Sequence, residues 1–145
     1  MLQLNKQVRK LFLDDYRVPK DCIQYMYTRI GSGQTIYLDN DWDVVTNYPE
    51  FVKYILDYGL PDLISFDHDL ADGHYHKNMQ QGVLNYESED FEKDEYKTGK
   101  HCAEWLCNYC LENKLIFPRY IVHSMNPVGA QNIINCIENY IKHNE

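Results

Sequence analysis

The stretch LISFDHDLADGHYH, residues 63–76, decides how we interpret the fold. It opens with a short apolar run that is typical of a buried strand. Five polar residues that suit chemistry follow this run: Asp67, His68, Asp69, His74 and His76. A structural turn does not need this mixture of carboxylates and imidazoles. The stretch therefore indicates a functional site just past the end of a strand.

Strands and helices alternate on both sides of this stretch. Short apolar runs predict strands at residues 10–15, 42–47, 62–66 and 119–125. Apolar residues at helical spacing, with suitable caps, predict helices at residues 48–58, 98–114 and 126–145. Alternation of this kind is typical of α/β proteins, so we predict a parallel sheet covered by helices.

Two segments do not fit the alternation. Residues 25–38 place apolar and aromatic side chains on both sides of a Gly-Ser-Gly turn, which predicts an inserted hairpin. Residues 71–97 form a long polar segment that we interpret as a lid or loop. Because we find no internal repeat and no linker, residues 1–145 are predicted to form a single domain.

Composition excludes several function classes. The formal net charge is −8, from 14 basic and 22 acidic residues, which argues against general binding of double-stranded nucleic acid. No apolar run has the length of a signal peptide or a membrane span, so we expect a cytoplasmic protein with no membrane partner. The five cysteines are an odd number, which favours reduced thiols.

The ends of three predicted strands carry polar residues. The end of the first strand gives Asp14, Asp15 and Arg17, that of the third gives residues 67–69, and that of the fourth gives His123, Ser124 and Asn126. In a parallel sheet the carboxyl ends of all strands lie along one edge, and ligands bind in the crevice there. We therefore expect three clusters that are distant in sequence to converge into one site.

The residue types predict the chemistry of this site. Several carboxylates gathered together cannot all stay ionised without a partner. A divalent metal, Mg²⁺ or Mn²⁺, is the natural partner, and the candidate ligands are Asp14, Asp15, Asp67 and Asp69. Arg17 is suited to a bidentate contact with phosphate, and His68 and His123 to proton exchange near neutral pH. The N–H groups of residues 128–130 open the last helix and are expected to bind an anion.

Each motif also has a structural explanation. The Asp14-Asp15 pair could be a turn or a cap, and His123 could be a buried histidine beside a capping serine. His74 and His76 are more simply explained as part of a solvated loop, because no second His or Cys pair supports a zinc site with Asp72. The Cys107-x-x-Cys110 motif lies on the apolar stripe of a helix, where a core role is favoured.

Four blocks of the sequence resemble the cyclic-phosphate processing receiver family. They are LFLDDYRVP, GLPDLISFDHDLADG, KTGKHCAEWLCNYC and YIVHSMNPVGAQNI, and they occur in this order between Leu11 and about Ile134. The family consists of small stand-alone relatives of response-regulator receiver domains. The resemblance implies a receiver-like, flavodoxin-type α/β fold. This is a three-layer sandwich with a mainly parallel sheet of four to five strands and helices on both faces.

The resemblance also implies roles for residues. Receivers bind Mg²⁺ through an acid pair after the first strand and an aspartate after the third, which are Asp14, Asp15 and Asp67 here. Ser124 matches the Ser or Thr that ends the fourth strand, and the family adds a histidine before it. The catalytic candidates are Asp14, Asp67, His68 and His123, and the substrate-binding candidates are Arg17, Lys97, Thr98, Ser124, Asn126 and Gly129.

The chain departs from receivers in one respect. Receivers carry a lysine at the end of a fifth strand, and here we predict no fifth strand after the last helix, which leaves Arg17 to supply the positive charge.

The expected function is metal-dependent binding and hydrolysis of a cyclic-phosphate nucleotide or RNA end. The alternatives are a non-catalytic module that binds or sequesters such a ligand and a signalling receiver phosphorylated on Asp67. We also expect that the protein can form homo-oligomers.

Overall fold

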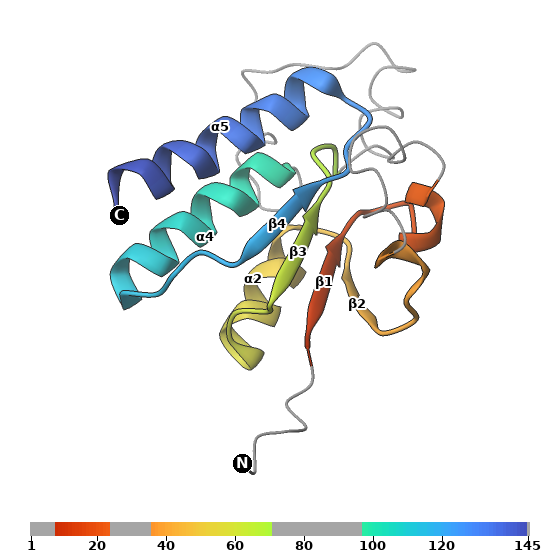
Figure 1. Ribbon diagram of the computed structural model, residues 1–145, viewed down its shortest axis with the longest axis horizontal. Helices are drawn as coiled ribbons and strands as arrows, with labels where there is room; N and C mark the ends of the chain where they lie inside the picture. Colours follow the sequence, from red (N-terminus) through yellow and green to blue (C-terminus); the bar gives the residue numbers. More distant parts are fainter. Residues whose placement is uncertain (1–7, 24–35, 71–96, 145) are drawn as a thin grey trace.

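The computed structural model describes residues 8–23, 36–70 and 97–144. These contain four strands, β1 (Lys10–Leu13), β2 (Trp42–Val45), β3 (Leu63–Phe66) and β4 (Arg119–Val122). All neighbouring strands are parallel, and they lie in the order β2-β1-β3-β4 (Figure 1). This confirms the predicted α/β sheet and its flavodoxin-type order, in which ligands bind where the carboxyl ends of β1 and β3 meet.

Three α-helices accompany the sheet, at α2 (Tyr48–Tyr58), α4 (Gly99–Asn113) and α5 (Pro127–His143). Local sequence explains their ends. The side chain of Asn47 accepts a hydrogen bond from the Glu50 N–H at 2.9 Å and starts α2. Gly59, with a φ of 83°, ends it, because glycine tolerates this left-handed region. All three helices agree with the predicted ones to within two residues.

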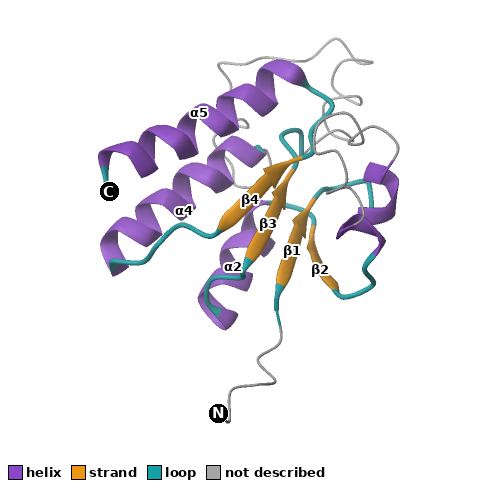
Figure 2. Cartoon of the chain, viewed as in Figure 1, coloured by secondary structure: helices purple, strands orange, loops and turns teal. Residues whose placement is uncertain are grey.

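One face of the sheet is covered by these three helices (Figure 2). Alternate strand residues point to this face, because successive side chains of a strand lie on opposite sides. Its main core joins strand residues Leu11, Leu13, Ile64, Phe66 and Val122 to the apolar stripes of the helices. Cys102, Cys107 and Cys110 lie in this core and all five cysteines carry free thiols, as expected.

The opposite face carries a smaller core. Phe12, Cys22, Tyr37, Trp42 and Leu63 are its buried members. Cys22 comes from a short 3-10 helix, η2 (Pro19–Cys22), and Tyr37 from another single turn at residues 36–38. Within the described residues, this third layer of the sandwich therefore consists of short 3-10 turns instead of a long α-helix.

Several predictions concern residues outside this description. Most of the hairpin predicted at 25–38 lies there, and its end at 36–38 is a 3-10 turn instead of a strand. Most of the predicted lid at 71–97, with His74 and His76, lies there as well. Among the helices that are described, none combines the length and apolar character that crossing a membrane requires.

Candidate functional site

The register of the sheet brings Asp14, Asp67 and His123 side by side. Leu13 pairs with Phe66, and Phe66 pairs with Val122. The residues that directly follow these three, one after each strand, are therefore also neighbours. Backbone bonds continue the ladder past the strands, from the Asp67 N–H to the Leu13 carbonyl at 3.0 Å and from the His123 N–H to the Phe66 carbonyl at 2.9 Å. The predicted convergence of the three clusters is therefore confirmed.

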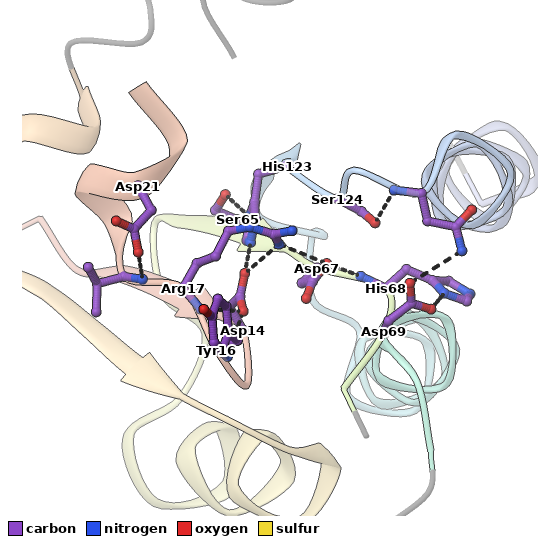
Figure 3. Close-up of polar contacts among 12 residues, drawn as sticks. Asp14, Tyr16, Arg17, Asp21, Ser65, Asp67, His68, Asp69, His123 and Ser124 are labelled. Carbon is purple, nitrogen blue, oxygen red and sulfur yellow. Dashed lines mark hydrogen bonds and ion pairs between the residues drawn. The ribbon is translucent and has the colours of Figure 1, made fainter. Parts of the chain in front are cut away.

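Asp14 is the most heavily bonded of the three. It is 1% exposed, and its Oδ1 accepts hydrogen bonds from the backbone N–H groups of Tyr16 and Arg17, both at 2.8 Å. Its Oδ2 is hydrogen-bonded to His123 Nε2 at 2.9 Å (Figure 3). Burial acts to raise the pKa of Asp14, but these hydrogen bonds outweigh it and hold the pKa below its usual value. Asp14 is therefore a buried anion.

Asp67 is buried too, but its pKa moves the other way. Burial raises it, and the nearby charge of Asp14 raises it further, to about 7. The charge of Asp15, which is half-buried, adds to the effect. Two acids on adjacent strands thus differ in charge near neutral pH. A cation placed between them would favour the ionised form of both.

Arg17 supplies the nearest positive charge. Its Nη1 lies 3.3 Å from Asp14 Oδ2 and 3.9 Å from Asp67 Oδ1. The side chain remains 23% exposed, so the guanidinium reaches the acids from the solvent side. Arg17 therefore stands between the two central carboxylates, where the sequence led us to expect a substitute for the receiver lysine.

His123 is fully buried. Its ring stacks on Phe12 with the ring centres 4.4 Å apart, and its Nδ1 lies 2.7 Å from Ser65 Oγ. Burial lowers the pKa of His123, and the neighbouring Asp14 only partly offsets this. Its expected role as proton donor or acceptor for a substrate stays a prediction, since both ring nitrogens contact protein groups.

His68 and Asp69 form a second polar pair at the same edge. His68 Nδ1 lies 2.8 Å from Asp69 Oδ1, and the side chain of Asn126 donates to Asp69 Oδ2 at 3.4 Å. Asn126 also starts α5, because its Oδ1 accepts from the Gly129 N–H at 3.0 Å. Gly129 therefore uses its N–H inside the protein, and not in the arrangement expected for anion binding.

Two glycines allow the helices to approach this segment. A Cβ on Gly129 would lie 2.4 Å from the His68 ring, and one on Gly99 would lie 1.7 Å from the Asp67 carbonyl oxygen. The Gly99 N–H also donates to the His68 carbonyl at 2.7 Å. Sequence analysis missed Gly99, although its position at the start of a predicted helix, where glycine is a poor helix former, was a usable signal.

A pocket of about 250 Å³ opens at this edge. The residues that line it are Arg17, Asp67, Asp69, Ser124, Met125 and Asn126. Three substrate-binding candidates, Lys97, Thr98 and Gly129, are not among these lining residues. Thr98 precedes α4 and donates its N–H to His101 Nδ1 at 2.9 Å, and Lys97 lies over the Tyr48 ring, 4.5 Å from its centre. Within the described residues, neither takes part in the pocket.

The donor set fits a divalent metal. Ligand atoms of Asp14, Asp67 and His123 all lie within 4.8 Å of one another. The raised pKa of Asp67 indicates that the cluster carries excess negative charge, and a cation would neutralise it. Carboxylate oxygens suit Mg²⁺ or Mn²⁺.

Comparison with known families is consistent with this geometry. Residues 9–139 match the cyclic-phosphate processing Receiver domain, a range that contains every residue of the site. The chain belongs to the cyclic-phosphate processing receiver family. Comparisons with curated proteins and with solved structures gave no match.

Membership of the cyclic-phosphate processing receiver family accounts for the sheet order and for the acids at its edge. The chain nevertheless differs from receivers in its strands and in the positive charge near the acids. In residues 97–144, which the structure describes, β4 is followed by α5 and by no further strand. The positive charge beside Asp14 and Asp67 is the guanidinium of Arg17, which belongs to the loop after β1.

Proposed function

We propose that this protein binds a cyclic phosphate at a divalent metal and hydrolyses it. One observation carries the proposal. The pocket combines an acidic wall, Asp67 and Asp69, with a cation, Arg17. The acids suit a metal ion and the guanidinium suits a phosphate, so the pocket offers a place to each member of a metal–phosphate pair.

The size of the pocket supports a small ligand group. A volume of about 250 Å³ is below the usual range for drug-sized ligands. It suits the phosphate and ribose at the end of a nucleotide or an RNA strand. Arg17, Ser124 and Asn126 line it and would contact phosphate oxygens through charge-assisted and neutral hydrogen bonds.

Asp14 and Asp67 would hold the metal, with Asp15 beside them. A bound Mg²⁺ or Mn²⁺ would polarise the phosphate and lower the pKa of a water molecule. The protein supplies the positions of the groups around it. Asp14 is fixed by its hydrogen bonds, and Arg17 is placed to stabilise the charge that develops on the phosphate.

Hydrolysis requires proton transfer as well. The oxygen of a water molecule bonds to phosphorus, one P–O bond of the ring breaks, and the departing ribose oxygen takes a proton. Asp69 lines the pocket and lies 2.8 Å from His68. We assign this pair to accept the proton of the water and to return it to the departing oxygen.

A cleavage screen tests the proposal. Purified protein with Mg²⁺ or Mn²⁺ would be offered RNA ends with a 2′,3′-cyclic phosphate, 3′,5′-cyclic nucleotides and cyclic oligonucleotides, and the products read by mass spectrometry. We expect one class to gain the mass of water. Asp67→Asn should abolish this, whereas Asp57→Asn, an exposed acid paired with Lys53 on α2, should not.

The other outcomes would contradict the proposal in different ways. Recovery of intact bound ligand would identify a binding or sequestering module. A mass gain of one phosphoryl group on Asp67 after incubation with a small phosphodonor would identify a signalling receiver. Equal turnover in wild type and Asp67→Asn would place the chemistry elsewhere. A cytoplasmic location and a homo-oligomeric state stay predictions.

A further inference from the structure

A chain of buried hydrogen bonds runs behind the site. Tyr37 Oη lies 2.8 Å from Ser65 Oγ, Ser65 Oγ lies 2.7 Å from His123 Nδ1, and His123 Nε2 lies 2.9 Å from Asp14 Oδ2. Figure 3 shows the part of this chain from Ser65 through His123 to Asp14. It begins on the face opposite the three α-helices and ends at a predicted metal ligand.

The chain is held rigidly and is shielded from water. Tyr37, Ser65 and His123 are each 0% exposed. The His123 ring is stacked on Phe12, and the Tyr37 ring is stacked on Trp42 at 5.6 Å between centres. Because buried polar groups are costly unless each is bonded, a serine in the middle of an apolar buried strand calls for a specific reason.

Proton counting fixes the direction of the chain. Asp14 Oδ1 accepts two backbone N–H groups and its Oδ2 accepts from the Arg17 guanidinium, so the proton between Asp14 and His123 belongs to Nε2. A neutral imidazole then offers Nδ1 as an acceptor, which Ser65 can fill with its O–H. Ser65 in turn accepts the O–H of Tyr37, and burial raises the pKa of Tyr37 well above its usual value, so that proton is present.

The reverse direction is unfavourable. It would place a bare Nε2 lone pair 2.9 Å from a carboxylate oxygen. With Nδ1–H donating to Ser65, either the Tyr37 or the Ser65 hydroxyl proton would lack an acceptor among the described residues, where these hydroxyls bond to each other and to His123. Every group in the first arrangement has a partner of the correct kind.

We propose that Tyr37 and Ser65 are positioning residues that hold His123 as the Nε2–H tautomer, so that His123 orients Asp14 and does not itself bind the metal. This inference rests on the proposed function only for the identity of what Asp14 binds. Carboxylates that bind a metal are commonly oriented by a further hydrogen bond, and the His123 Nε2–H would supply that bond to Asp14.

The proposal decides between two donor sets. Distance alone would allow His123 Nε2 to join Asp14 and Asp67 as a ligand. A set with imidazole suits zinc, whereas carboxylates alone suit Mg²⁺ or Mn²⁺. If Nε2 carries a proton, the donors are oxygens only, and the site is selective for hard cations.

The direct test is the tautomer of His123 in the wild-type protein. Nitrogen-15 NMR of the imidazole distinguishes a protonated from an unprotonated ring nitrogen. We expect a protonated Nε2 and an unprotonated Nδ1 both without metal and with Mg²⁺. An unprotonated Nε2 in either sample, or a shift of Nε2 to a metal-bound value, would overturn the proposal. The metal-free spectrum decides the tautomer even if the proposed function is wrong.

Two variants test the positioning role through Mn²⁺ affinity, measured by calorimetry. Ser65→Ala removes the donor to Nδ1 and should weaken binding about 10-fold. Tyr37→Phe should weaken it less, because Ser65 can still donate. Tyr54→Phe is the matched control, since its hydroxyl bonds Asp43 and Arg9 away from the site. Unchanged affinity in folded Ser65→Ala would overturn the role, whereas absence of Mn²⁺ binding in wild type would overturn the proposed function and leave the tautomer result standing.

Discussion

The two faces of the sheet differ in what fills them. The face covered by α2, α4 and α5 is packed with aliphatic and aromatic side chains and thiols. The opposite face holds a small aromatic core through which the Tyr37–Ser65–His123 chain passes to Asp14. Apolar packing carries the stability of the first face, whereas directed hydrogen bonds on the second place one carboxylate.

The difference shows how one fold separates stability from function. Leu13, Phe66 and Val122 point to the helices and bury apolar area. The next residue of each strand, Asp14, Asp67 and His123, stands at the edge of the sheet. A shift of one residue along any strand would exchange these roles. The register that builds the core therefore also builds the site.

The largest expected effect comes from the helix-covered face. Leu106 on α4 is fully buried in the main core, and Leu106→Ala should cost about 3 kcal/mol of unfolding free energy, because it removes apolar contacts and leaves a cavity. Chemical denaturation measures this. Mn²⁺ affinity of the folded fraction should stay unchanged. A stability loss below about 1 kcal/mol would show that this face is less decisive than we argue.

The second prediction concerns Asp67 at the edge of the sheet, where a substitution should raise the free energy of unfolding. The pKa of Asp67 is about 7 in the folded protein and near 4 when unfolded. The folded state therefore binds the proton more tightly, and metal-free stability falls as pH rises from about 4 to about 7. Asp67→Asn removes this loss. Because each pKa unit corresponds to about 1.4 kcal/mol and relaxation reduces the effect, we expect a gain of about 2 kcal/mol at pH 8.

Thermal denaturation at pH 4 and pH 8, in a chelator, checks this prediction. The gain should be absent at pH 4, where Asp67 is protonated in the folded protein. Addition of Mg²⁺ should stabilise wild type and leave Asp67→Asn unchanged. An equal effect of the substitution at both pH values would refute the electrostatic explanation.

A smaller effect is expected where a helix meets the edge. Gly129→Ala places a Cβ 2.4 Å from the His68 ring, which must move and break its contact with Asp69. We expect a stability loss of about 1.5 kcal/mol and reduced turnover. Val128→Ala, at a neighbouring side chain that is 71% exposed, is the control. If Gly129→Ala behaves like Val128→Ala, the close approach is not a constraint.

The smallest effect concerns a local cap. Asn47→Ala removes the hydrogen bond to the Glu50 N–H that starts α2 and should cost about 1 kcal/mol. Asn47→Asp keeps an acceptor and should cost less, as urea denaturation would measure. Neither variant should change metal binding, and a change would show that the two faces are coupled.

Sequence predicted the helix-covered face well, because its information is local. Helical spacing of Ala103, Leu106 and Cys107, and apolar runs in the strands, suffice to place a core. The convergence of Asp14, Asp67 and His123 was predictable for a different reason. Parallel strands align their carboxyl ends, so the residue after each strand is placed by topology alone.

The rest depended on tertiary contacts. Tyr37 meets Ser65 across 28 residues of sequence, and no periodicity links them. Ser65, a polar residue inside an apolar strand, was a signal that could have been used. Lys97 and Thr98 were predicted from the motif that carries the family resemblance, and neither lines the pocket: the Lys97 ammonium lies over the Tyr48 ring and Thr98 precedes α4. Residues that belong to the same sequence motif therefore need not line the same pocket.

The most direct test of the central claim is a Mn²⁺ titration followed by electron paramagnetic resonance. The claim is that Asp14 and Asp67 together hold one divalent cation at the edge of the sheet. We predict that wild type and the Asp57→Asn control bind Mn²⁺, that Mg²⁺ displaces it, and that Asp67→Asn does not bind it. Equal Mn²⁺ binding by wild type and Asp67→Asn would contradict the claim.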